Sequence, residues 1–352
     1  MIAAIILILL ICAFEFVNWF HDTANAVATV IYTKTLKAKT AVIYSAVMNF
    51  LWILISTTIG YGVAYKIFHL IPWDKLQTWS AGHIGISIIG AILVSALSWN
   101  IITRWFKIPS SSTHALIASI VWSTMALAHI QWWNMNPFGG ELNHIMLSLV
   151  ISPLLGIVGW YLLYRIAKRC IHNKSIFHSP HHEHEEKWVS ALLIFTCWFV
   201  SFSHGANDGQ KWLGMIMITL VATGIITATS DFTIPLRAII LVPTVLWSGT
   251  MIWRERIVKT VGKKIGTHDM TYAQWACAEL IAATTIGAAS VSGLPVSTTH
   301  VLSSAVMGTM INGKSDSINW ETIRHIWLAW VLTIPVCGIT SFLLVELFNQ
   351  VW

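Results

Sequence analysis

The sequence predicts an all-α polytopic membrane protein made of two inverted-topology repeats, with interrupted helices and half-helix or re-entrant segments. Of its residues, 56% are hydrophobic and only 10% are charged, whereas a soluble domain carries about 25% charged residues. Apolar segments of about 20 residues recur along the chain, and this is the length of a membrane-spanning helix. Two unrelated polar motifs also recur at one shared offset, which indicates that one unit was duplicated.

The first repeat is predicted at residues 1–166. Its apolar segments lie at 1–36, 41–65, 83–106 and 144–166, and a shorter apolar run ends at residue 130. Because the apolar residues are continuous rather than alternating, the segments favour membrane helices over the strands of a β-barrel. Tryptophans near segment ends, such as Trp73 and Trp132, suit the interface between bilayer and water.

A polar linker at 167–187 is predicted to separate the repeats. It carries the linker histidines His178, His181, His182 and His184. The second repeat is predicted at 188–352. Its apolar segments lie at 188–227, 234–253, 271–293 and 325–348, with a shorter run that ends at residue 311. Long and short segments therefore follow the same order in both halves of the chain.

Two pairs of motif residues set the offset between the repeats. Asp22 and Asp208 are 186 positions apart, and so are Pro109 and Pro295. Each half therefore separates its aspartate from its proline by 87 residues. Two independent motifs with one offset are not expected by chance, so we predict the duplication of one folding unit.

The basic residues predict how the repeats are oriented. Seventeen of the 21 lysines and arginines lie in the loops 33–39, 104–112, 165–187, 254–264 and 312–324. Cytoplasmic loops carry the excess of basic residues, so these loops, with the linker among them, are predicted to be cytoplasmic. Each repeat then crosses the membrane five times, and this odd number inverts the second repeat. Inverted repeats with interrupted helices are the plan of many secondary transporters, whose sites lie at mid-membrane.

Charged residues inside apolar segments indicate where such a site lies. The stretch 203–211 contains Asp208 and Lys211, and the stretch 18–25 contains Asp22. At membrane depth these groups are costly unless they face a cavity and bind something. The glycines of the stretch 203–211 are expected to break the helix, and the freed backbone groups would contact protein, ion or substrate. We therefore expect both segments to be interrupted at these stretches.

Asp22, Asp208 and Lys211 are the candidate residues for a coupling cation. Either carboxylate is able to hold a cation or to carry a proton. Lys211 occupies the repeat position of Asn25 and would either attract an anion or neutralise Asp208. A purely structural pair of Asp208 and Lys211 is the alternative, but it does not account for Asp22. Asn25 and Asn207 are predicted to line the anion cavity.

The second motif places hydroxyl groups beside a predicted helix start. Proline and the Ser or Thr residues after it favour a helix N-terminus, and a half-helix that begins inside the membrane directs its positive end at a cavity. Hydroxyls beside unpaired N–H groups suit an oxyanion such as phosphate or sulfate. The alternative is an N-cap at the membrane surface, which two copies at the repeat offset disfavour. The candidate anion ligands are Ser111, Ser112, Thr113, Ser297, Thr298 and Thr299.

Other titratable residues carry weaker signals. His114 and His300 end the two motifs and would either shuttle protons or bond a hydroxyl or carbonyl group. The linker histidines would bind a metal or belong to a solvated loop, which is the favoured interpretation. Glu15 and Glu279 lie inside apolar segments without acidic repeat mates and would line the route.

Several function classes are excluded. No nucleophile elbow, P-loop, HExxH or Rossmann glycine pattern is present, and no segment is long and polar enough for a nucleotide-binding domain. An enzyme or an ATP-driven pump is therefore not expected. The net charge of +6 follows the loop topology and does not indicate a nucleic-acid partner. The five cysteines are scattered without metal-ligand spacing, and no cofactor is expected.

The motifs resemble those of the inorganic phosphate transporter (PiT) family. The resemblance rests on Gly205-Ala206-Asn207-Asp208, on its partner at 21–26, and on the duplicated Pro-x-Ser-x-Thr-His motifs. The string at 20–29 is especially similar to the bacterial low-affinity, proton-coupled phosphate permeases. The resemblance implies an inverted-repeat fold. It also implies symport of phosphate with H⁺ or Na⁺, in some bacterial members as a neutral metal–phosphate complex.

Two departures from the family pattern bear on the coupling ion. The usual Asn-Asp pair is His21-Asp22 in the first half, and the second Asn of the signature is Lys211 in the second half. A lysine in place of an amide that would bind Na⁺ favours coupling to protons, or one cation site fewer.

The sequence therefore predicts a multi-pass protein of the cytoplasmic (inner) membrane that imports inorganic phosphate through the lipid bilayer. Import is predicted to occur by alternating access and cation symport, with H⁺ favoured over Na⁺. Three alternatives stay open: phosphate moved together with a divalent metal, a sulfate or other oxyanion permease of the same fold, and a divalent-metal-binding membrane protein that uses the linker histidines. A homodimer is compatible with the sequence.

Overall fold

The computed structural model describes residues 2–73, 83–106, 110–127, 139–180, 187–227, 233–251, 270–311 and 319–351. Within these ranges the side chains of residues 20, 21, 24, 25, 59, 127, 139, 310, 311 and 351 are not described. Several residues of the sequence-based predictions lie outside the described residues: Pro109, Trp132, the side chains of His21 and Asn25, and the linker histidines His181, His182 and His184.

Every regular element in the described ranges is helical. The helices are α1 (Ile2–Tyr32), α2 (Ala38–Ile59), α3 (Gly62–Phe68), α5 (His83–Trp105), α6 (Ser112–Leu127), α7 (Gly139–Cys170), α8 (Lys187–Ala222), α9 (Leu236–Met251), α11 (Tyr272–Val291), α12 (Thr298–Ile311) and α13 (Trp320–Val351), with a short 3₁₀ helix at Lys174–Phe177. Among them, α1, α2, α5, α7, α8 and α13 are long and apolar enough to cross a membrane. Helices suit this environment because their backbone groups bond within the segment.

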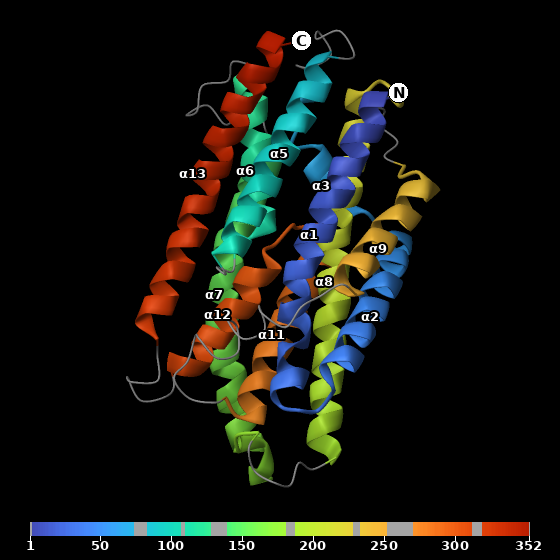
Figure 1. The fold of residues 1–352 in the computed structure, drawn as a ribbon. Helices are drawn as coiled ribbons and strands as arrows, with labels where there is room; N and C mark the ends of the chain where they lie inside the picture. The colour runs from blue at the N-terminus through green and yellow to red at the C-terminus, as the bar shows by residue number, and fades with distance from the viewer. Residues whose placement is uncertain are drawn as a thin grey trace.

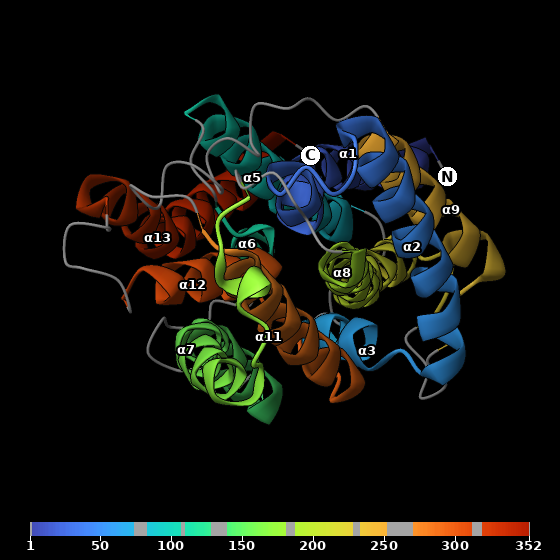
Figure 2. The ribbon, with the colours of Figure 1, turned by 90° about the horizontal axis from the view of Figure 1, so that it is seen from below.

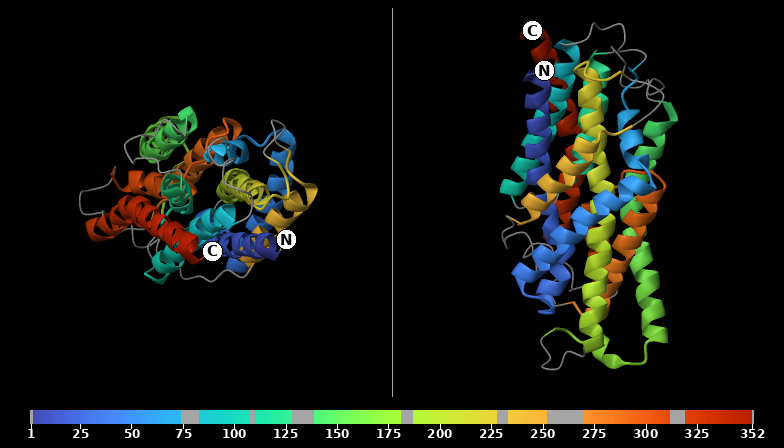
Figure 3. Two further views of the ribbon diagram at one scale, coloured as in Figure 1. Left: turned by 90° about the horizontal axis from the view of Figure 1, so that it is seen from above. Right: turned by 90° about the vertical axis from the view of Figure 1, so that its right-hand side faces the viewer.

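Most of the helices lie roughly along one axis, α2 and α9 are inclined to it, and both chain termini lie at the same end of the bundle (Figure 1). At the opposite end, α7 and α8 extend beyond the other helices and are joined by the linker (Figure 3). The view along the bundle places α8 near the centre, beside α1, with α2 and α9 on one side and α7, α12 and α13 on the other (Figure 2).

The packing partners of the two halves correspond to each other. Helix α7 packs against α12 and α11, and its counterpart α13 packs against α6 and α5. In the same way α1 contacts α9, and α8 contacts α2. The last helix of each half therefore covers the short helix of the other half. These corresponding contacts belong to the inverted-repeat fold, whereas the repeat boundaries at 166 and 188 remain predictions.

Helices α1 and α8 continue without a break through the stretches where interruptions were expected. Helix α8 includes both Gly205 and Gly209 in its buried centre. A Cβ atom on Gly205 would lie 3.0 Å from the carbonyl oxygen of Asn49, and one on Gly209 would lie 2.6 Å from Ile53 Cδ1. The expectation of a break in α8 was wrong because these glycines let α2 approach closely, as small residues do between membrane helices.

The interruptions of the fold lie elsewhere. Helix α2 stops at Gly60, whose φ of 154° favours glycine, and α3 resumes at Gly62. The side-chain oxygen of Gln210 accepts the free N–H of Val63 at 3.0 Å. Helices α6 and α12 are half-length, with 16 and 14 residues, and α12 follows α11 after a turn at Gly293. The half-helices are therefore present at the predicted motifs, whereas the interrupted helix is broken at residues 60–61 and not at the stretches 18–25 or 203–211.

The helix breaks at Gly62 and Gly293 contact each other, so a larger residue at either position is expected to lower the stability of the protein. A Cβ atom on Gly62 would lie 2.8 Å from the Cα atom of Gly293, so both chains would have to move apart. We expect Gly62→Ala to lower the free energy of unfolding by about 1–3 kcal/mol, measured as a lower melting temperature of the purified protein. The control is Gly140→Ala, since nothing lies within 4 Å of that added Cβ atom. Equal melting temperatures for the two variants would contradict this packing account.

Candidate anion and cation site

Three charged or titratable side chains of α8 and one of α1 meet inside the bundle. His204, Asp208 and Lys211 are spaced so that they share one face of α8. His204 Nε2 lies 3.1 Å from Asp208 Oδ2 and 3.7 Å from Asp22 Oδ2. All four side chains are buried. The structure therefore brings Asp22 and Asp208 together, as predicted, and places His204 between them.

Lys211 connects this cluster to both half-helices. Its Nζ lies 2.6 Å from Asp208 Oδ1, and it donates to Thr113 Oγ1 at 2.6 Å and to the carbonyl oxygen of Val296 at 2.8 Å. Thr113 is on the first turn of α6, and Val296 lies just before α12. The half-helices therefore begin beside the charged cluster.

The half-helix starts are capped as the sequence predicts. Ser111 Oγ accepts the N–H of His114 at 3.1 Å, and Ser297 Oγ accepts the N–H of His300 at 3.2 Å. Each serine is thus the N-cap of its helix. Both serines are buried rather than at a membrane surface, so the caps lie inside the bundle. The partial positive charge of each helix start is consequently directed into the interior.

The two helix starts also contact each other. Thr113 donates to the carbonyl oxygen of Val296 at 3.1 Å, and the rings of His114 and His300 lie 4.3 Å apart between centroids. Thr299 donates to Asp22 Oδ1 at 3.1 Å. The hydroxyl-bearing motifs of the two halves therefore meet each other and the two aspartates at one place in the fold.

The remaining predicted anion ligands differ in their burial and in their contacts with the protein. Ser112 is half-buried and Thr298 is buried, each as the first residue of its helix. Asn207 is engaged by protein, because its amide donates to Ser290 Oγ and the carbonyl oxygen of Leu294 and accepts the N–H of Val296. Asn207 therefore holds the turn before α12 against α8, and its contact with an anion remains a prediction.

Two of the weaker candidates, Glu15 on α1 and Glu279 on α11, accept hydrogen bonds inside the bundle. Glu15 accepts a hydrogen bond from Trp19 at 2.8 Å, and Glu279 accepts one from Thr196 at 2.6 Å. Each of the two glutamates also has a buried carboxylate oxygen without a hydrogen-bond partner, Oε2 in Glu15 and Oε1 in Glu279. Both are buried, which agrees with their place inside apolar segments. His178 follows the 3₁₀ helix of the linker and is exposed.

One group of residues in the described ranges has the geometry to hold a cation. Asp22, His204 and Asp208 each offer one ligand atom, and these atoms lie within 4.8 Å of one another. His204 was missed as a site residue by reasoning from sequence, although it precedes Asp208 by one helical turn. This spacing was the available signal, since residues four apart on a helix are neighbours.

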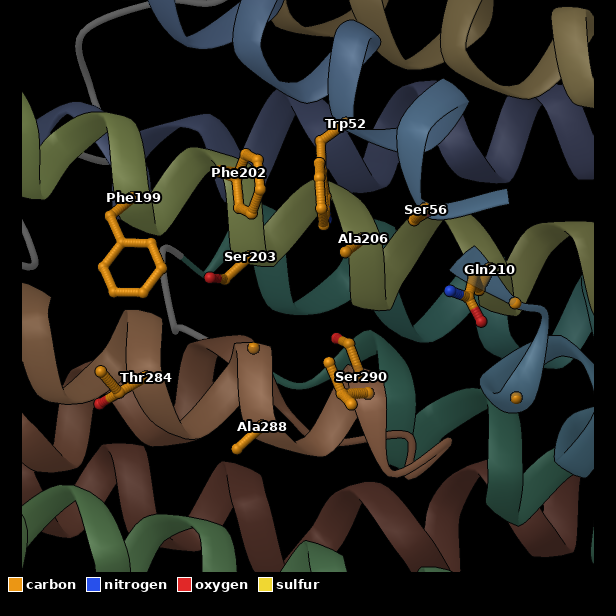
Figure 4. Close-up of a pocket in the computed structure, with 14 residues that line it drawn as sticks. Trp52, Ser56, Phe199, Phe202, Ser203, Ala206, Gln210, Thr284, Ala288 and Ser290 are labelled. Atoms are coloured by element: carbon orange, nitrogen blue, oxygen red, sulfur yellow. The ribbon is translucent and has the colours of Figure 1, made fainter. Parts of the chain in front are cut away.

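A cavity of about 400 Å³ lies on another side of α8, between α2, α8 and α11 (Figure 4). Its wall includes Trp52, Ser203, Gln210 and Ser290, and no charged side chain is among the described residues that line it. Ser290 accepts the amide of Asn207, so this cavity adjoins the site but does not contain the charged cluster. A second cavity of about 390 Å³ reaches Val296 from the side of α7.

The profile of the phosphate transporter family matches residues 18–341. The chain belongs to this family. As a member of this family, the protein is a multi-pass membrane transporter and not an enzyme, as the sequence predicted. The resemblance to the family that the motifs indicated is confirmed.

Individual relatives agree with the family assignment. The chain is 33% identical to a protein of Bacillus subtilis described as a probable low-affinity inorganic phosphate transporter, covering 100% of this chain and 99% of that protein. It is 30% identical to the low-affinity inorganic phosphate transporter PitA of Escherichia coli, covering 96% and 95% of the two chains. A solved structure described as the sodium-dependent phosphate transporter has a TM-score of 0.80 at 21% identity over both full chains, which supports the fold.

Proposed function

We propose that this transporter imports inorganic phosphate across the cytoplasmic (inner) membrane by cation symport and alternating access, with H⁺ as the coupling ion. The observation that carries the proposal is the meeting of two capped half-helix starts with Asp22 and Asp208 inside the bundle. Binding sites near mid-membrane between inverted repeats are typical of secondary transporters.

The phosphate would lie between the starts of α6 and α12. Helix N-termini attract anions because their N–H groups are unpaired and the helix dipole is positive there. The hydroxyls around this place add donors for a tetrahedral oxyanion. The proposed phosphate ligands are Ser111, Ser112, Thr113, Ser297, Thr298 and Thr299, with Asn25 and Asn207 lining the same space.

The charge of the cluster supports cation symport. Asp208 pairs with the ammonium group of Lys211, and the carboxylate of Asp22 lies 3.7 Å from His204 Nε2. With His204 neutral, the cluster has one negative charge in excess, and an entering phosphate would add more. A buried anionic site of this kind is costly at membrane depth. A proton, on His204 or on Asp22, or a bound cation would offset the excess charge, so phosphate and cation would enter together.

The packing between the halves supports alternating access. Helix α6 packs against α13, and α12 packs against α7. Each half-helix would therefore move together with a long helix of the other repeat. Rocking of one repeat against the other would expose the helix starts to one side of the membrane at a time.

Uptake of labelled phosphate into proteoliposomes tests this proposal. An inward proton gradient should raise the initial rate by about tenfold over vesicles without a gradient, the size typical of coupling between two ligands. An excess of unlabelled phosphate should compete fully and sulfate should not. Transport driven only by a Na⁺ gradient would contradict H⁺ coupling, and equal competition by sulfate would contradict phosphate specificity. A requirement for added Mg²⁺ would indicate that a metal–phosphate complex is the species moved.

A further inference from the structure

Lys211 has all of its hydrogen-bonding capacity satisfied by protein oxygen atoms. An ammonium group has three N–H donors and no acceptor. Its three partners are a carboxylate oxygen of Asp208, the hydroxyl of Thr113 and the carbonyl oxygen of Val296, at 2.6, 2.6 and 2.8 Å. The side chain is 2% exposed. No donor is left to bind an anion in this conformation.

The three partners are the oxygen types that hold metal cations. Carboxylates, hydroxyls and backbone carbonyls at interrupted helices are common ligands of hard cations. They also come from three different places, namely α8, the first turn of α6 and the turn before α12. The ammonium of Lys211 therefore occupies a position at which a bound cation would find three converging oxygen ligands.

The equivalent place in the first half is built differently. There the hydroxyl of Thr299 donates directly to Asp22 at 3.1 Å. In the second half the ammonium of Lys211 lies between the corresponding pair, Thr113 and Asp208. The residue at the repeat position of Lys211 is Asn25. The two halves thus differ by one covalently attached positive charge.

We propose that Lys211 is a tethered cation that permanently fills the cation site of the second half. This inference rests on the proposed symport of phosphate. Because the ammonium cannot leave, the site of Asp208, Thr113 and Val296 exchanges no ion during the transport cycle. Only the side of the cluster that contains Asp22 takes up and releases a coupling cation, and transport does not require Na⁺ at the Asp208 side.

Replacing the tethered charge should open the site to a free cation. In Lys211→Asn the second half receives the residue type of the first half, and the oxygens of Asp208, Thr113 and Val296 remain. We expect phosphate uptake by this variant to fall in choline medium and to rise about tenfold when Na⁺ replaces choline at equal ionic strength. The melting temperature of the purified variant should also rise with Na⁺ concentration, because a ligand stabilises the folded state that binds it.

Two control variants separate this effect from general damage. Lys211→Met removes the charge but keeps much of the side-chain volume, so its side chain should fill the space of a free cation, and the variant should lose uptake without any response to Na⁺. Lys66→Asn removes a partly exposed lysine that pairs with Glu141 at 3.5 Å, and it should behave as the unmodified protein in both media.

The outcomes distinguish this inference from the proposed function. If the unmodified protein takes up no phosphate, the proposed function fails. If it does so and Lys211→Asn shows no added Na⁺ response in uptake or melting, the tethered-cation proposal fails alone. Should Lys211→Asn not accumulate in the membrane, Lys211→Ala leaves the same three oxygens and is measured in its place. Absence of both variants from cells grown in Na⁺-rich medium would also overturn the proposal, since a site that accepts Na⁺ should be rescued by it.

Discussion

Asp22→Asn and Asp208→Asn are each expected to reduce uptake of labelled phosphate at least 100-fold, an order-of-magnitude figure that corresponds to about 2.7 kcal/mol. Both substitutions keep the size of the side chain and remove its negative charge. Without that charge the site would no longer draw in the cation that accompanies phosphate. Initial rates in a host that lacks other phosphate transporters give the measurement.

The two variants should differ in stability. In Asp208→Asn the buried ammonium of Lys211 loses its carboxylate partner, and removal of one partner of a buried pair costs about 3–5 kcal/mol. Asp22→Asn keeps an oxygen for Thr299 and should accumulate normally. The control is Glu141→Gln, since Glu141 is a partly exposed carboxylate. Normal uptake in both aspartate variants would remove them from the coupling mechanism.

Thr113→Val and Thr299→Val are expected to produce the second largest loss. Valine has the shape of threonine without its hydroxyl group. In Thr113→Val the ammonium of Lys211 loses an acceptor, and in Thr299→Val the carboxylate of Asp22 loses a donor. An unpaired buried partner costs about 1–3 kcal/mol, so we expect kcat/KM for phosphate to fall about 5- to 150-fold. Thr→Ser at either position should restore most of the rate.

A matched control shows whether the loss is specific to the half-helix starts. Thr244 donates within α9 to the carbonyl oxygen of Ile240 at an exposed position, so Thr244→Val should leave uptake unchanged. If Thr113→Val and Thr299→Val retain the same KM for phosphate as Thr244→Val, the hydroxyl groups of the helix starts are not part of the anion site.

Much of the fold is predictable because the membrane restricts the choices. Long apolar segments must become helices there, and the repeat offset between Asp22 and Asp208 reveals the duplication. The offset also predicts the half-helices, since α6 and α12 begin at Ser112 and Thr298, 186 positions apart (298 − 112). The N-caps Ser111 and Ser297 follow from ordinary helix-start chemistry.

Other features depend on contacts that a single sequence does not reveal. Glycine inside an apolar segment permits either a break or a close approach of a neighbouring helix. Gly205 and Gly209 serve the second purpose because α2 lies against them. His204 lies in the motif, yet its role emerges only when Asp22 of α1 is placed next to it. Likewise the carbonyl oxygen of Val296 has no signature in the sequence, since every residue carries one.

The most direct test of the central claim is a pair of electron cryo-microscopy maps of the purified protein, recorded with and without saturating phosphate. The account predicts additional density between the starts of α6 and α12, within hydrogen-bonding distance of the serine and threonine side chains that begin both helices. Additional density confined to the cavity beside Trp52, or to any other place away from the two helix starts, would contradict it.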